Sequence, residues 1–169
     1  VVYQDLMRVN NAVADGTLEQ NPVLQAAFAA AREPGRRFHL MGLLSDGGVH
    51  AMRTHAEALC HMAHRAGVAH TFVHAFTDGR DADPKSGKRY MEQFLAAVAG
   101  TGARVASVTG RYYAMDRDKR WERISKAYEV LVHGKGVPTS DPLEAFTSSY
   151  ATGKTDEFIE PHVVVDGAG

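Results

Sequence analysis

The stretch Phe38-His39-Leu40-Met41-Gly42-Leu43-Leu44-Ser45-Asp46-Gly47-Gly48-Val49-His50 decides the fold, because a hydrophobic run, a glycine turn and a helical pattern follow one another there. The run predicts a strand over residues 37–44, and because it is apolar on both faces we expect it at the centre of a sheet. The glycines let the backbone approach a ligand, and the start of the following helix offers unpaired N–H groups to an anion. This order predicts a small-ligand site at residues 46–50.

The same order of strand, loop and helix recurs along the chain. Further strands are predicted at residues 69–76, 104–108 and 163–165, and helices at residues 3–14, 21–32, 51–66, 86–99, 119–133 and 141–152. Strands that alternate with helices predict an α/β fold, here a three-layer sandwich with a mostly parallel central sheet and helices on both faces. Residues 134–139 are predicted to form a loop. The helix over 119–133 is predicted to turn four side chains to the core: Trp121, Ile124, Tyr128 and Leu131.

Composition limits the class of protein. The 169 residues are enough for one domain, over residues 1–169, with a core of its own. A formal net charge of −1 argues against a general attraction to nucleic acid or to a membrane surface. The single cysteine, Cys60, excludes an internal disulfide, fits a reducing cytoplasm and is predicted to be a small buried hydrophobe. Because the chain starts at Val1 without Met and stops just after an apolar run, we expect an excised domain.

Two later strands also end in charged loops, at residues 77–84 and 109–117. The carboxyl ends of parallel strands meet at one edge of the sheet, which is where open α/β sheets bind ligands. We therefore expect the three loops to converge and to bring together His50, Arg80, Asp81, Arg111 and Arg117. An arginine fork pairs with carboxylate or phosphate through two N–H groups, so three forks at one edge favour a small, multiply charged anion.

The roles of single residues stay open at this stage. Asp81 is either a structural partner of a neighbouring arginine or an acid/base group for a substrate hydroxyl. His50 either donates to a phosphate oxygen or transfers a proton, or it caps the following helix or packs against it. Three further aspartates of these loops are predicted to be turn and cap residues: Asp46, Asp78 and Asp116. The aromatic pair Tyr112-Tyr113 is predicted to pack beneath the arginine loop.

The remaining histidines are assigned structural roles. Glu57, His61 and His64 have helical spacing that is compatible with a metal, but we expect an exposed face without a ligand. His39 and His74 fall within strands and are predicted at the edge of the core.

Several familiar catalytic motifs are missing from the sequence. It contains no G-x-x-x-x-G-K-[ST] phosphate loop, no G-x-G-x-x-G after a strand, no G-x-S-x-G elbow and no H-E-x-x-H zinc pair. No nucleophile with its own activating base is evident. The residues therefore indicate a binding site without obvious bond-making groups.

At these loops the sequence closely resembles cofactor-independent phosphoglycerate mutase. The matching segments lie in order along nearly the whole chain, at residues 2–6, 40–50 (LMGLLSDGGVH), 74–81 (HAFTDGRD), 107–117 (SVTGRYYAMDR), 121, 126–128 and 155–158. Thr77 and Thr109 depart mildly from the pattern, since an aliphatic residue and a serine are expected there.

The resemblance implies a two-domain enzyme. A phosphatase-like domain holds two manganese ions and a serine that is transiently phosphorylated, and a second domain, inserted into the first, grips the glycerate. This chain resembles the inserted phosphotransferase domain, without the phosphatase-like domain. By motif match, its substrate contacts are His50, Arg80, Asp81, Arg111 and Arg117.

The implied reaction is the isomerisation of 3-phosphoglycerate to 2-phosphoglycerate in glycolysis and gluconeogenesis, through a phosphoserine on the other domain. Arg111 and Arg117 hold the carboxylate or phosphate, His50 assists at the phosphoryl group, and Asp81 with Arg80 binds and deprotonates the glycerate hydroxyl. No serine motif or manganese-ligand set is evident in the chain. We therefore expect it to bind no metal and to be inactive alone, and we expect a cytoplasmic, monomeric enzyme without nucleic-acid or membrane partners.

Two other readings compete with this one. The first is a stand-alone, non-catalytic module that binds small anions. The second is a metal-dependent hydrolase that uses Asp46 and His50.

Overall fold

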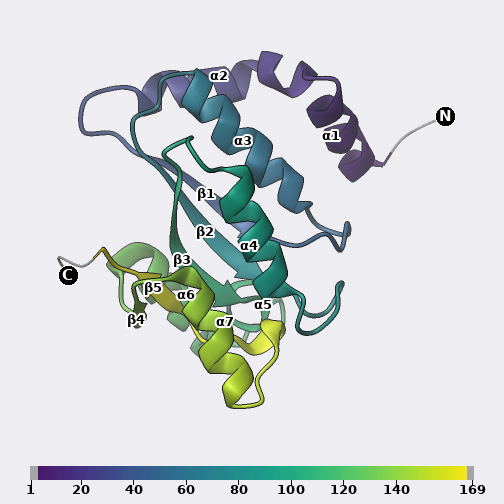
Figure 1. Cartoon of the computed structure of the whole chain (residues 1–169), viewed down its shortest axis with the longest axis vertical. Helices are drawn as coiled ribbons and strands as arrows, with labels where there is room; N and C mark the ends of the chain where they lie inside the picture. Colours follow the sequence, from purple (N-terminus) through teal and green to yellow (C-terminus); the bar gives the residue numbers. More distant parts are fainter. Residues whose placement is uncertain (1–3, 167–169) are drawn as a thin grey trace.

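The computed structural model describes residues 4–166 and forms an α/β fold (Figure 1). The helices are α1 (Asp5–Ala14), α2 (Pro22–Ala31), α3 (Arg53–Arg65), α4 (Gly87–Ala97), α5 (Arg111–Ala114), α6 (Trp121–His133) and α7 (Pro142–Ala151), with the 3-10 turns η1 (Thr17–Gln20) and η2 (Asp156–Phe158). The strands are β1 (Phe38–Leu43), β2 (Thr71–Thr77), β3 (Arg104–Gly110), β4 (Val137–Thr139) and β5 (His162–Val164). The first predicted helix is present from Asp5, and its predicted first residue, Tyr3, lies outside the described residues.

The five strands form one sheet in the order β1-β2-β3-β5-β4. Neighbours β1, β2 and β3 are parallel, β5 is antiparallel to β3, and β4 is parallel to β5. Helices α3, α4 and α7 cover the near face of the sheet in Figure 1, and α5 and α6 lie behind it. The predicted three-layer arrangement with a mostly parallel sheet is confirmed.

The prediction that the strand at residues 37–44 is central is wrong, because β1 is an edge strand. Its inner residues Phe38 and Leu40 pack against the core, whereas Met41 on the other face is 63% exposed. An apolar residue on each face therefore does not show that both faces are covered. The sheet is centred on β3, which pairs with β2 on one side and β5 on the other.

The predicted loop at residues 134–139 also contains a strand, β4, which pairs with β5. Pro138 lies within it. Proline cannot donate a ladder hydrogen bond, but it is tolerated on an edge strand such as β4. The sequence Val-Pro-Thr alone therefore does not indicate a strand, and only the pairing with β5 identifies it.

Helix α6 is rotated relative to its predicted orientation. Ile124 and Leu131 are half-buried as expected, but Trp121 is 71% exposed and Tyr128 is exposed as well. The fully buried positions are Ala127 and Val130. Small residues on the buried side allow the helix to approach the sheet closely, and hydrophobicity alone selects the wrong stripe.

The main core lies between the sheet and helices α3, α4 and α7, and includes Met91, Phe94 and Val108. Cys60 is buried there as predicted, and burial, with a smaller contribution from Glu57, raises the pKa of its thiol to about 12. Among the described helices, each is too short or too polar to cross a membrane.

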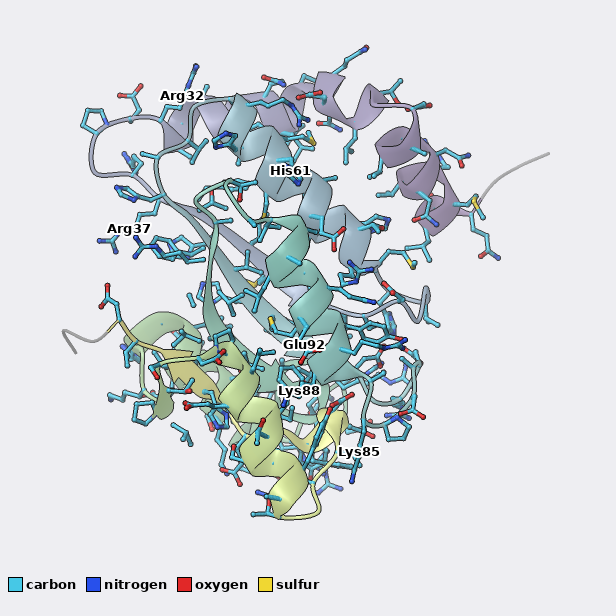
Figure 2. The ribbon with its side chains drawn as sticks, in the orientation of Figure 1. Arg32, Arg37, His61, Lys85, Lys88 and Glu92 are labelled. Carbon is cyan, nitrogen blue, oxygen red and sulfur yellow. The ribbon has the colours of Figure 1, made fainter. Side chains whose placement is uncertain are left out.

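The face of α3 that carries Glu57, His61 and His64 makes hydrogen bonds to the segment that ends α4. His61, labelled in Figure 2, donates to the carbonyl of Ala97 through Nε2 at 3.0 Å, and His64 donates to the carbonyl of Thr101 through Nδ1 at 3.1 Å. Glu57 binds Arg53 one turn away. The two histidines thus connect α3 to the end of α4 and to the turn after it, although His64 remains exposed and the hydrogen bond of His61 lies at the surface.

Candidate functional site

The three charged loops converge at the carboxyl ends of β1, β2 and β3 because these strands are adjacent and parallel. They border a cavity of about 390 Å³. All five residues predicted to form a site line it: His50, Arg80, Asp81, Arg111 and Arg117. Six further residues complete the lining: Tyr112, Met115, Asp116, Asp118, Arg123 and Glu157.

Arg111 lies at the centre of the polar contacts, and its side chain is 11% exposed. Its Nη1 donates to Asp78 Oδ1 at 2.7 Å and to Asp81 Oδ2 at 2.6 Å. Burial alone lowers the pKa of this guanidinium, but the hydrogen bonds and charges of Asp81 and Asp78 outweigh burial, so the pKa is raised. Arg111 is therefore a fixed cation whose orientation is set by two carboxylates.

His50 stands at the rim of the cavity, half exposed, near the same cation. Its Nε2 is 3.3 Å from Arg111 Nη2 and 3.5 Å from Asp81 Oδ2. Since arginine only donates, the imidazole accepts this hydrogen bond through Nε2. His50 thus belongs to the charged cluster at the cavity.

Asp78 accepts hydrogen bonds from its own turn and from two other segments. It accepts from the backbone N–H groups of Arg80 and Asp81, as predicted for a turn residue, and also from Ser45 and Arg111. Burial alone raises the pKa of this carboxyl, but these hydrogen bonds outweigh burial and lower it, so Asp78 is ionised. The sequence signal of its wider role is weak, because an Asp before Gly is typical of turns.

Arg80 and Arg117 are held more loosely than Arg111. The side chain of Arg80 is 65% exposed, and its Nη1 lies 3.8 Å from the carboxylate of Glu157. Arg117 is exposed, and among residues 4–166 it has no ion-pair partner. These two cations remain available to an anion in the cavity.

Asp116 orders the loop that carries Arg117, in line with its prediction as a turn and cap residue. Its Oδ2 accepts from the backbone N–H groups of Asp118 and Arg120, and its Oδ1 accepts from Arg123 Nη1 at 3.3 Å. The Arg123 guanidinium lies 3.9 Å from the centre of the Tyr112 ring, a cation–π contact. The sequence did not point to Arg123, which joins the cavity from the first turn of α6.

The aromatic pair packs beneath the arginine loop as predicted. Tyr113 is buried, and Tyr112 contacts both Tyr113 and Phe158, with ring centres 5.2 and 5.1 Å apart. Phe158 belongs to η2, a segment that the sequence marks only through its resemblance. Glu157, in the same turn, is a lining residue that the sequence did not single out.

The η2 segment supports two of the loops from below. The Thr77 hydroxyl donates to the carbonyl of Asp156 at 2.6 Å, which gives this departure from the expected aliphatic residue a buried partner. A side chain at Gly79 would lie 2.7 Å from Glu157 N, and one at Gly110 would lie 2.7 Å from Ile159 N. Only glycine allows these backbones to approach so closely.

Asp46 takes no part in the cavity. It binds Arg53 Nη2 at 3.4 Å and is absent from the lining residues. Within residues 4–166, no group of three or more His, Cys, Asp or Glu side chains is arranged to hold a metal ion. A hydrolase site built on Asp46 and His50 therefore has no support in the geometry.

Comparison with known proteins places the chain in a family. A family model described as "BPG-independent PGAM N-terminus (iPGM_N)" matches residues 9–169. The chain is 50% identical over 163 residues to the 2,3-bisphosphoglycerate-independent phosphoglycerate mutase of Bacteroides thetaiotaomicron, covering 96% of this chain and 32% of the relative. It is 53% identical over 171 residues to the enzyme of the same name from Thermomicrobium roseum, covering 100% of this chain and 32% of the relative.

A solved structure agrees with the sequence relatives. The crystal structure of Leishmania mexicana phosphoglycerate mutase at low cobalt concentration superposes with a TM-score of 0.89 and 32% identity, covering 99% of this chain and 32% of that chain. The chain thus spans about a third of the length of the relatives it matches. It belongs to the family of the N-terminal region of BPG-independent phosphoglycerate mutases.

Proposed function

We propose that this chain is the substrate-binding domain of a phosphoglycerate mutase, an isomerase that interconverts 3-phosphoglycerate and 2-phosphoglycerate. The observation that carries the proposal is the convergence of His50, Arg80, Asp81, Arg111 and Arg117 on one cavity, in a chain of this family. The substrates each carry a phosphate, a carboxylate and a hydroxyl group. A cavity with three arginines, a histidine and a carboxylate matches these groups in charge and in hydrogen-bonding capacity.

Arg111 and Arg117 have different roles in binding the substrate. Arg111, fixed by two carboxylates, orients one anionic group, while the exposed Arg117 supplies charge for the phosphate or carboxylate from the other side. Phosphoryl transfer depends mainly on positioning and on charge stabilisation, so a domain without a nucleophile still contributes strongly to the rate.

Asp81 and His50 serve the reacting groups. Asp81 accepts a hydrogen bond from Arg111 Nη1 at 2.6 Å and lines the cavity, so it binds the free hydroxyl of the glycerate and receives its proton when the phosphoryl group returns. Arg80 stands beside it, held near Glu157. His50 contacts the phosphoryl group from the rim of the cavity.

The phosphorylated serine and two manganese ions belong, in this proposal, to a phosphatase-like domain of the same polypeptide. The side chains of residues 4–166 do not fit a manganese site, since they contain no suitable ligand group. No step assigned to this chain therefore involves a metal. We expect the 169-residue chain to be inactive alone.

The competing proposal is a module that binds small anions and catalyses nothing. The length of the open reading frame that encodes this chain separates the two. A flanking phosphatase-like region is expected, and the complete polypeptide should convert 3-phosphoglycerate to 2-phosphoglycerate.

The site is tested by Arg111→Ala in the complete polypeptide. We expect kcat/KM to fall by about 10³-fold, because the charge-assisted hydrogen bonds of a largely buried cation are lost. Arg104→Ala is the matched control, since Arg104 lies at the amino end of β3, opposite the end that leads into Arg111, and its side chain is 70% exposed. Normal turnover of Arg111→Ala would contradict the proposed site, and absence of mutase activity in the wild-type polypeptide would contradict the proposed function.

A further inference from the structure

Asp78 connects all three loops of the site, although it does not line the cavity itself. Its carboxylate is 3% exposed. The Oδ2 atom accepts from the Ser45 hydroxyl at 2.6 Å, on the loop after β1. The Oδ1 atom accepts from Arg111 Nη1 at 2.7 Å, at the end of β3.

The same Oδ1 atom also organises the loop after β2. It accepts from the backbone N–H of Arg80 at 3.2 Å and from that of Asp81 at 3.0 Å. An aspartate that serves only a turn needs just these two local hydrogen bonds. The additional bonds from Ser45 and Arg111 join segments far apart in the sequence, and they require a burial that an ordinary turn residue avoids.

We propose that Asp78 is a positioning residue for substrate recognition, which acts by fixing the orientation of the Arg111 guanidinium relative to the 78–81 turn. This inference rests on the proposed function. With Asp78 and Asp81 both bound to Nη1, recognition of the substrate anion falls to Nε and Nη2 of Arg111. Asp78 thereby decides which edge of the planar fork faces the ligand.

The two carboxylates on Arg111 differ in how easily a ligand displaces them. Asp81 lines the cavity and is partly exposed, so it can exchange Arg111 for a substrate hydroxyl. Asp78 is buried beneath the cavity and held by Ser45 and two backbone N–H groups. It keeps Arg111 in place while Asp81 changes partner.

A positioning role and a simple charge effect predict opposite results. Asp78 adds a negative charge close to an anion site, so removal of its charge alone should tighten substrate binding. If Asp78 instead orients Arg111, removal of the charge weakens binding, because the fork loses its fixed direction. The isosteric variant Asp78→Asn distinguishes the two effects, since it retains an oxygen for the backbone N–H groups.

The test uses the complete polypeptide. For Asp78→Asn we expect KM to rise about tenfold, with a smaller change in kcat, because the oxygen that accepts from Arg111 no longer carries a charge and holds the guanidinium less firmly. Ser45→Ala, which frees Oδ2 without a change of charge, should raise KM in the same direction by less. Asp83→Asn is the matched control, because Asp83 is an exposed aspartate of the same loop that accepts only locally, from Lys85 N at 3.0 Å.

Two further measurements separate positioning from a loss of stability. First, Asp78→Asn and Arg111→Lys should be strongly non-additive, because both weaken the same contact between residues 78 and 111. Second, guanidinium ion, added to Arg111→Ala well below the concentrations that unfold proteins, should restore part of the activity by occupying the slot between the two carboxylates. The restoration should disappear when Asp78→Asn is added.

The outcomes are distinct. An inactive wild-type polypeptide would overturn both the function and this inference. An active wild type in which Asp78→Asn behaves like Asp83→Asn, or binds substrate more tightly, would overturn the positioning role alone. So would additive effects of Asp78→Asn and Arg111→Lys, or guanidinium rescue that is indifferent to Asp78.

Discussion

Arg111 and Arg117 line the same cavity from the same loop, but the protein holds them in opposite ways. Arg111 is 11% exposed and donates to two carboxylates. Arg117 is exposed, and within the described part of the chain no carboxylate pairs with it. Its loop is ordered by the carboxylate of Asp116, which accepts from two backbone N–H groups and from Arg123. One arginine therefore supplies direction and the other supplies charge.

The strongest test of this difference replaces each arginine by lysine in the complete polypeptide. Lysine retains the charge but not the planar fork, so Arg111→Lys should lower kcat/KM by about 100-fold, whereas Arg117→Lys should lower it by about threefold. Steady-state kinetics with 3-phosphoglycerate measure both. Equal losses in the two variants would remove the distinction between direction and charge.

Gly110, where β3 meets Arg111, tests how closely the base of the loop is packed. A Cβ at this position would lie 2.7 Å from Ile159 N, so we expect Gly110→Ala to lower the free energy of unfolding by about 2–3 kcal/mol. Gly42→Ala is the control, because Gly42 lies in a strand and its added Cβ would meet nothing within 4 Å. Denaturant unfolding of the chain measures both, and similar values would contradict the close contact.

His74, in β2, tests whether the stability of the fold depends on pH. It is buried between His39 and Ser107, with ring nitrogens 3.0 Å from His39 Nδ1 and 2.8 Å from Ser107 Oγ. Burial, with a smaller effect of His39, lowers the pKa of His74 from 6.5 to about 4. Between these values the unfolded chain binds more protons than the folded one, so acidification destabilises the fold.

We therefore expect the stability of the wild type, relative to His74→Gln, to fall by about 2 kcal/mol as the pH is lowered from 6.5 to 4. The comparison with a variant is needed because buried Asp156 acts in the other direction. Burial raises the pKa of Asp156 to about 6, so its contribution to stability is lost as the pH rises through 6. Parallel stability curves for wild type and His74→Gln would show that His74 has an ordinary pKa.

The smallest effect concerns the charge of Arg117. Arg117→Ala in the complete polypeptide should raise KM about fivefold at low ionic strength and about twofold at high ionic strength, because salt screens an exposed charge. Arg120→Ala serves as the control, since Arg120 is exposed in the same loop and does not line the cavity. The corresponding loss for Arg111→Ala should be nearly independent of salt. A salt-independent effect at Arg117 would assign it a buried contact instead.

Prediction from the sequence succeeded where the signal is local or where a simple topological rule applies. Alternating strands and helices, separated by glycine and proline, indicate the α/β class, and parallel strands bring their carboxyl ends together. This was enough to place His50, Arg80, Asp81, Arg111 and Arg117 at one cavity. The residues of the motif-bearing loops are thus accessible to sequence reasoning.

Prediction failed where the answer depends on a partner from elsewhere in the chain. Neighbouring segments decide three features that the sequence did not predict: the position of β1 at the edge of the sheet, the presence of strand β4 and the rotation of helix α6. The hydrogen bond of His61 was not predicted because its acceptor, the carbonyl of Ala97, belongs to another helix. Hydrophobic periodicity shows that a surface is buried but not what covers it.

By itself, the sequence determined the order of the elements, the glycine-bearing turns and the set of charged side chains available at one edge of the sheet. The tertiary structure alone decided how these charges are paired. In the folded chain Asp78 contacts three loops instead of its own turn alone, Arg111 donates to two carboxylates, and Arg117 stays exposed. The physical reason is that ion pairing and burial depend on distances between segments, and these are set only when the strands assemble.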